Sequence, residues 1–398
     1  MITGHRLTAS VRHPRRHQSG SMTLLVGLVL LVGAGILTFS AGRTGVVEQR
    51  IANNEFRAQE AQQAAQAGLD YALAWLAENI WRSGDAEPAP PEITTSSGEI
   101  YRTALIFTKT AQGVCVRAQA RATTEQRISA SVRECVQQQG LFDPAATSAM
   151  PPPLVLAGCL GAPDETANLF LPDDAARSVM SGHAANNVCL PQGALSVSVW
   201  HDRNGNLVKD ADEVGSGATY RRASFGGCPG DQCAWKRVFA MPLEDAKAAA
   251  IQAGHRFDDS IPCGATTPPG IYLIEHTRPI HALDISGSCT GAGVDNRTLG
   301  TPERPILFIV PRETGCPLFE PGISIHGMVY YESTTACAVQ GWGGARIHGA
   351  VIWEGDAGPP PVNTEFIAPG DRAGSELNDD YQVIRGATRL PGTWRDWE

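Results

Sequence analysis

Residues 22–41 of the chain read MTLLVGLVLLVGAGILTFSA, and no Asp, Glu, Lys or Arg occurs between residues 17 and 42. A helix of about 20 such residues is long enough to cross a hydrocarbon layer of about 30 Å. The segment therefore predicts one membrane-spanning helix. The residues before it hold no acid and four arginines, Arg6, Arg12, Arg15 and Arg16. This asymmetry predicts that the N-terminus is cytoplasmic and that the body of the protein is not.

The helix is expected to continue beyond the membrane, because residues 46–82 contain no proline. Apolar residues recur there at the three- and four-residue spacing of one helical face: Leu69, Ala72, Leu73, Leu76 and Ile80. We therefore predict one rod over residues 21–82, roughly 90 Å long at 1.5 Å per residue. The alternative is a signal anchor followed by an unrelated stalk.

The composition bounds the rest of the chain. The length of 398 residues predicts two or three folded units, and 42 glycines with 27 prolines favour β structure and loops. The formal charge of −9, which becomes −13 without the four leader arginines, argues against a nucleic-acid partner. All ten cysteines follow residue 114, which indicates an oxidising compartment such as the periplasm.

A small antiparallel sheet is predicted over residues 93–140, after the proline-rich break GDAEPAPPE at residues 84–92. Two alternating segments flank a turn at residues 123–126. Folding the chain about Glu125 places Cys115 opposite Cys135, since both lie ten residues from the turn. Directly opposed residues of an antiparallel pair can reach disulfide distance, so we expect this disulfide.

Residues 141–264 are expected to be an irregular or β region with further disulfides. Its most informative segment is HDRNGNLVKDADE, residues 201–213. Oxygen-bearing groups occupy the ligand positions of a calcium loop: Asp202, Asn204, Asn206, the Val208 carbonyl, Asp210 and Glu213. However, Leu207 stands where an EF-hand loop has glycine. The alternative is a turn held by its own side-chain hydrogen bonds.

Residues 265–369 contain a weak repeat. ISIHGMVYYE, residues 323–332, aligns with ARIHGAVIWE, residues 345–354, and the two Ile-His-Gly triplets lie 22 residues apart. His281 occupies a related position two periods before His326. A strand about every 22 residues predicts a short right-handed β-solenoid, with a β-sandwich as the alternative. Residues 370–398 are expected to form a C-terminal tail.

The remaining disulfides are predicted by pairing nearest neighbours, which is one choice among many. The pairs are Cys159–Cys189, Cys228–Cys233, Cys263–Cys289 and Cys316–Cys337.

A basic leader that ends in Gly20, followed by Ser21 and a long apolar helix, resembles the type IV pilin signal. The phrase from residue 50 to residue 73, with its AQQAAQAGLDYAL block, resembles PilX-type minor pilins, although Gln66 stands where that family usually has an acid. The ending LPGTWRDWE is similar to the close of some long members. The resemblance implies that a prepilin peptidase cuts after Gly20 and methylates Ser21. Leu25 takes the place of the glutamate of major pilins, which favours a minor role.

We therefore expect an α+β minor pilin of a type IV pilus, and no enzyme. It would be held in the inner membrane of a Gram-negative bacterium with a periplasmic body, and would then act at the pilus or cell surface in assembly, initiation, the tip or adhesion. The expected partners are other minor pilins, the assembly machinery, the prepilin peptidase and the membrane, with no nucleic acid and no small-molecule substrate. Calcium is the one cofactor considered. The alternative is a membrane-anchored periplasmic solenoid that binds or acts on polysaccharide, with Asp284, Arg346, Glu354 and Asp356 as candidate residues.

Overall fold

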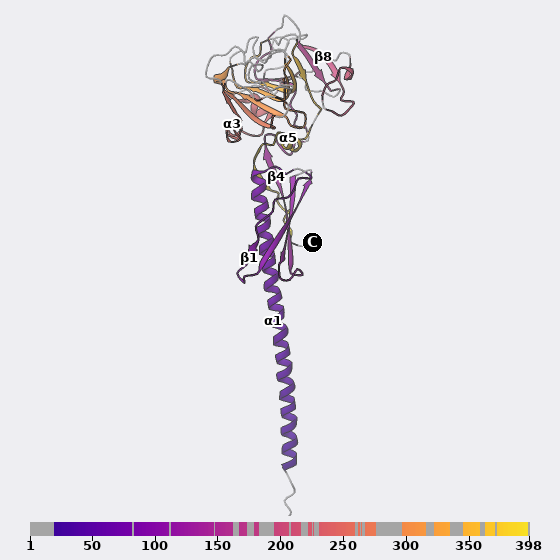
Figure 1. Ribbon diagram of the computed structural model, residues 1–398, viewed down its shortest axis with the longest axis vertical. Helices are drawn as coiled ribbons and strands as arrows, with labels where there is room; N and C mark the ends of the chain where they lie inside the picture. The colour runs from indigo at the N-terminus through magenta and orange to yellow at the C-terminus, as the bar shows by residue number, and fades with distance from the viewer. Residues whose placement is uncertain are drawn as a thin grey trace, which may run out of the picture.

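The computed structural model shows a long helix that carries a small sheet at its upper half and a β-rich head at its end (Figure 1). It combines helix and antiparallel sheet in an α+β architecture, as predicted. The described residues are 20–81, 83–110, 113–146, 148–161, 167–172, 179–182, 195–206, 208–215, 222–224, 226, 231–258, 262, 264, 267–275, 297–315, 322–334, 345–358, 363–370 and 372–396.

Helix α1 runs without interruption from Gly20 to Glu78, which confirms the predicted rod. Its 59 residues make it about 88 Å long at 1.5 Å per residue. Among the described residues, one helix is long and apolar enough to cross a membrane, and it is α1. The helix ends four residues before the predicted limit, and Gln138 donates hydrogen bonds of 2.8 Å to the carbonyl groups of Leu76, in the last turn, and of Asn79, just beyond it. Side-chain donors of this kind satisfy the free carbonyls at a helix end.

The sheet beside α1 is antiparallel and has the strand order β1-β2-β3-β4-β18. Its strands are β1 (Ile93–Thr94), β2 (Ile100–Thr110), β3 (Gly113–Ala122), β4 (Ser129–Gly140) and β18 (Ile384–Arg389). The predicted sheet is therefore present, and the tail adds a fifth strand to it. The chain consequently ends beside this sheet and not in the head (Figure 1).

The inner face of the sheet packs on the upper half of α1. The helix contributes small buried residues such as Ala61, Ala65 and Ala72, and the sheet contributes Val116 and Ala118. Small side chains on both surfaces let the two backbones approach closely. This core is separate from the clusters of buried hydrophobic residues in the head.

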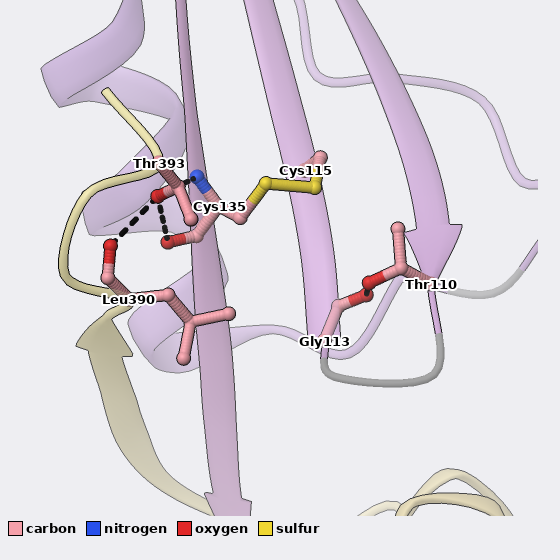
Figure 2. Close-up of a disulfide and its surroundings, with 6 residues drawn as sticks. All are labelled: Thr110, Gly113, Cys115, Cys135, Leu390 and Thr393. Atoms are coloured by element: carbon pink, nitrogen blue, oxygen red, sulfur yellow. Dashed lines mark hydrogen bonds between the residues drawn. A yellow bond between two sulfur atoms is a disulfide. The ribbon is translucent and has the colours of Figure 1, made fainter.

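The predicted disulfide between Cys115 and Cys135 is present, and the two residues are direct partners in the β3–β4 register. Figure 2 shows that the tail lies against it. The Cys135 amide donates to the Thr393 hydroxyl at 3.0 Å, and that hydroxyl donates to the Leu390 carbonyl at 2.7 Å. The Leu390 amide in turn donates to the Cys135 carbonyl at 2.8 Å. The tail therefore continues the sheet beside the disulfide.

The head is built on a second sheet, in which every strand pair is parallel except β8–β9. Its described strands are β5 (Leu154–Leu156), β6 (Ala167–Leu171), β7 (Val179–Ser181), β8 (Leu195–Trp200), β9 (Val214–Gly215), β10 (Arg222–Ser224), β11 (Arg256–Asp258), β12 (Gly270–Glu275), β13 (Thr298–Leu299), β14 (Ile306–Val310), β15 (Ser324–Tyr331), β16 (Arg346–Trp353) and β17 (Glu365–Ile367). The helical segments are η1 (Ala211–Glu213), α2 (Cys233–Val238), α3 (Leu243–Gln252), η2 (Arg312–Thr314) and α5 (Gly374–Tyr381).

The repeat noted in the sequence lies in register in the structure, with His326 opposite His348 and Gly327 opposite Gly349. The glycines are explained by close backbone contact. A Cβ atom on Gly349, whose φ is +153°, would lie 1.7 Å from the Gly327 carbonyl oxygen. An antiparallel sandwich is not the arrangement of these strands, because β12, β14, β15 and β16 pair in parallel. The closed right-handed solenoid stays a prediction.

The expected boundary between residues 141–264 and 265–369 does not divide the head. Strands β5, β6 and β8 from the first region join the same sheet as β16 and β17 from the second. The first region was expected to be irregular because its strands are short. Strand β5, for example, is three residues long and buried at every position, so it has no alternation to reveal it.

The other predicted disulfides each include a cysteine outside the described residues. Cys159 and Cys233 are both disulfide-bonded. The pairs Cys159–Cys189, Cys228–Cys233, Cys263–Cys289 and Cys316–Cys337 stay predictions.

Replacing Gly68 with Ala should destabilise the helix–sheet contact, because the new Cβ would lie 2.3 Å from Cγ2 of Thr103. Overpacking of this kind costs about 1–3 kcal/mol. Gly45→Ala is the matched control on the same helix, since nothing lies within 4 Å of its Cβ position, and it should stabilise by about 1 kcal/mol through helix propensity. Chemical unfolding of the full chain in a non-ionic detergent measures both. Equal effects of the two substitutions would contradict the close approach.

Candidate functional site

The lower half of α1 is an exposed apolar rod, defined here as residues 22–41. Its large side chains are uncovered from end to end, with Met22 76%, Leu25 63% and Phe39 76% exposed. Apolar surface of this extent is unfavourable in water. The rod therefore requires a bilayer or neighbouring helices around it.

The predicted processing residues lie at the start of α1. The helix begins at Gly20, so the bond between Gly20 and Ser21 falls in its first turn. Residues 1–19 lie outside the described residues. Leu25 lies in the exposed rod, and the first acidic residue of the helix is Glu48. No carboxylate of this helix therefore lies near its N-terminal turns.

The tail connects the sheet to α1 through a set of polar contacts, which we call the tail clamp. Arg389 pairs with Asp70 of α1 at 2.9 Å and with the buried Glu134 of β4 at 3.1 Å. The Trp394 indole donates to Gln66 of α1 at 3.2 Å. Sequence reasoning noted Gln66 and the tail ending separately. It missed the contact between them, because no local pattern joins residues more than 300 positions apart.

The predicted calcium ligands do converge in one loop between β8 and β9. The amide nitrogens of Asn204 and Asn206 donate to the Asp210 carboxylate at 2.8 and 3.1 Å. The Asn206 backbone amide donates to Asp202 at 3.1 Å and the Val208 amide donates to Asn206 at 2.8 Å.

Glu213 closes the same loop. It is buried and accepts hydrogen bonds from the backbone amides of Arg203 at 2.7 Å and Asp210 at 3.2 Å. In the part of the chain that the structure describes, no three His, Cys, Asp or Glu side chains are grouped closely enough to hold a metal ion. These hydrogen bonds are those of the alternative, a self-supporting turn. Calcium binding stays a prediction.

The residues considered for binding or acting on polysaccharide form hydrogen bonds and ion pairs with other parts of the protein. Glu354 accepts hydrogen bonds from the backbone amides of Ala234 and Trp235, at the start of α2, and from the Tyr330 hydroxyl at 3.0 Å. Burial raises the pKa of Glu354, although these hydrogen bonds act in the opposite direction. Asp356 accepts from the Cys159 amide at 2.7 Å and Arg346 pairs with Glu365 at 3.2 Å. Asp284 and His281 lie outside the described residues.

The two described histidines of the repeat are stacked, with ring centroids 4.3 Å apart. They line a cavity of about 250 Å³ together with Arg372, Leu377 and Tyr381. Burial lowers the pKa of His326 to about 4, against a smaller opposing effect of Glu303. Burial, followed by the charges of His326, Lys209 and Arg346, lowers that of His348 to about 3. Both rings are therefore neutral near pH 7.

Comparisons with known proteins give little support from outside the chain. No protein-family profile matches it, and no curated protein matches it. The crystal structure of the competence-associated pilin ComZ from Thermus thermophilus is similar at 10% sequence identity, over 85% of this chain and 96% of that one, with a TM-score of 0.23. Similarity at this level does not show the function of this chain.

The stacked histidines predict that acid weakens the head. Above about pH 6.5 neither the folded nor the unfolded state protonates them. As the pH falls below this value, the unfolded state binds protons that the folded state excludes until its own pKa is reached, so stability falls. For His326 the loss is about 3 kcal/mol by pH 4. His326→Phe keeps a ring at the position and should reduce the difference between urea unfolding at pH 7 and pH 4.5. An unchanged difference would contradict the buried neutral state.

Proposed function

We propose that the chain is a minor pilin of a type IV pilus, of the PilX type. The observation that carries the proposal is the division of α1, whose residues 22–41 are exposed and apolar while residues 61–76 are covered by an antiparallel sheet. An apolar rod that continues into a sheet-covered helix suits two environments in succession. Such a helix can first span a membrane alone and can later pack among other such helices in a fibre.

Leu25 supports a minor position in such a fibre. In major pilins a glutamate at this point pairs with the N-terminal amine of a neighbouring subunit, and the apolar Leu25 cannot do so. The proposed role is therefore at assembly, at initiation or at the tip, where such a pair is not needed. The proposed partners are other minor pilins, the assembly machinery, the prepilin peptidase and the inner membrane of a Gram-negative cell, and the body is periplasmic before export.

The head gives the proposal a second feature. It is larger than the sheet module and lies at the end of α1 that is remote from the exposed rod (Figure 1). A subunit with so large a head at its outer end fits a terminal position better than a repeating one. The proposal is of a structural component and not of an enzyme.

Processing by a prepilin peptidase is the test. Intact mass of the membrane-extracted protein should show loss of residues 1–20 and gain of one methyl group, only in cells that have the peptidase. Gly20→Val should leave the chain uncut. Gly27→Val, a substitution in the exposed rod, should leave the cut unaffected. A chain cut after Ala41, or uncut in both strains, would overturn the proposal.

Calcium at the loop of residues 202–213 is a separate proposal. Bound calcium would raise the Tm of the full chain, and a chelator would reverse the rise. Asp210→Asn should abolish the response and Asp231→Asn, on an exposed site outside the loop, should keep it. An unchanged Tm with and without calcium would identify the loop as a self-supporting turn.

A further inference from the structure

A cavity of about 250 Å³ in the head is lined by residues of the parallel sheet and of helix α5. His326 of β15 and His348 of β16 contribute to its wall, and so do Leu377, Asp380 and Tyr381 of α5. Helix α5 lies in the part of the chain that was expected to form a tail. The cavity therefore brings the histidines of the repeat together with residues that no sequence pattern connected to them.

Three residues of the wall have a buried polar atom without a hydrogen-bond partner among the described residues. These atoms are Nδ1 of His326, Nδ1 of His348 and the hydroxyl oxygen of Tyr381. His326 is 5% exposed and Tyr381 is 1% exposed. A buried polar group without a partner is costly, and folded proteins contain few of them. Three such groups around one cavity favour a bound molecule that supplies their partners.

The three groups can exchange hydrogen bonds with a ligand in either direction. A neutral imidazole has one donor nitrogen and one acceptor nitrogen, and the hydroxyl of a tyrosine both donates and accepts. The wall therefore suits a ligand with a hydroxyl group, which also donates and accepts.

The described wall of the cavity carries no net charge near pH 7. Both imidazoles are neutral, because burial lowers the pKa of His326 to about 4 and that of His348 to about 3. Arg372 forms an ion pair with Asp380, so each of these charges has an opposite charge beside it. A charged ligand would lose its hydration on entering and would meet no unpaired opposite charge on the described wall. The cavity therefore favours a neutral ligand.

The rest of the wall is mainly apolar, and it is formed by Met150, Leu377, Pro302, Pro305 and Pro369. Contact of an apolar ligand surface with such a wall is favourable. An engineered apolar cavity of about 150 Å³ in another protein binds benzene, so a cavity of about 250 Å³ has room for a ring and its substituents. A rigid ring also loses less conformational freedom on binding than a flexible chain does.

We propose that this cavity binds a small neutral ring compound with an apolar body and a hydroxyl group, of the phenol class. The hydroxyl of the ligand exchanges hydrogen bonds with the Tyr381 hydroxyl and an imidazole, and its ring packs against Leu377 and the prolines. The inference does not depend on the pilin assignment, since it concerns the head alone.

Binding can be measured by ¹⁹F NMR of 4-fluorophenol titrated with the full chain in a non-ionic detergent, with the detergent alone as the blank. The signal should shift saturably, with a Kd of about 1 mM or below for a ligand of this size. 4-Fluorotoluene has a similar ring without the hydroxyl and should bind about fivefold more weakly, which corresponds to the loss of one hydrogen bond. 4-Fluorobenzoate, which is charged at pH 7, should not bind.

Tyr381→Phe and His326→Phe each remove one polar group of the wall and keep an aromatic ring. Each should weaken the binding of 4-fluorophenol about fivefold and leave that of 4-fluorotoluene unchanged. Tyr381→Phe removes a hydroxyl that has no partner among the described residues, so thermal unfolding should show no loss of stability. Tyr71→Phe is the matched control, since Tyr71 is 37% exposed on α1 and does not line the cavity. It should leave the binding of all three compounds unchanged.

An absence of saturable 4-fluorophenol binding would show that water alone fills the cavity and would overturn the proposal. Equal binding of 4-fluorotoluene, or binding of 4-fluorobenzoate as tight as that of 4-fluorophenol, would also overturn it. An affinity for 4-fluorophenol that neither Tyr381→Phe nor His326→Phe lowers would place the binding elsewhere and contradict the site.

Discussion

The packing of the small residues of α1 on the inner face of the five-stranded sheet is the contact on which the rest of the structure depends. Ala61, Ala64 and Ala65 are almost completely buried there, and Gly68 lies against Thr103 of β2. Close approach of two small-residue surfaces gains dispersion contacts along the whole interface. Because the sheet uses this half of the helix, the other half has no partner within the chain. The same interaction that gives the upper helix its core therefore leaves the lower helix dependent on lipid or on other helices.

The head is an insertion in the sheet module and does not simply follow it. The chain leaves the sheet after β4 at Gly140 and returns to β4 as β18. The two crossings are joined at the junction, where the Asn378 side chain accepts from the Phe142 amide at 2.8 Å and donates to its carbonyl at 2.9 Å. Lys109 of β2 also pairs with Asp379 at 2.7 Å. Two linked crossings restrain a head more than a single linker can, so the head and the rod are held in a defined relation.

Sequence patterns predicted the elements whose signals are local. The period of Leu69, Ala72, Leu73 and Leu76 indicated the helical face that the structure buries, and the equal distances from Glu125 located the Cys115–Cys135 disulfide. The Ile-His-Gly triplets were found to align in register, with a backbone contact that explains their glycines. The strands of residues 154–181 could not be predicted in the same way, because a fully buried strand such as β5 has no polar alternation. The tail clamp and the Glu354 contacts to α2 join residues more than 100 positions apart, and no spacing rule reports such contacts.

The inserted head also limits what composition can exclude. The net charge of a chain describes its surface only if acidic and basic residues are mixed over that surface. In this fold they are divided between the sheet module and the head. The strands of the sheet module are basic and the region inserted between β4 and β18 is acidic. At physiological salt the Debye length is about 8 Å, which is shorter than the length of β3 at ten residues of about 3.4 Å each. The charges of the head are therefore largely screened along the sheet, and exclusions based on net charge hold for each module and not for the chain.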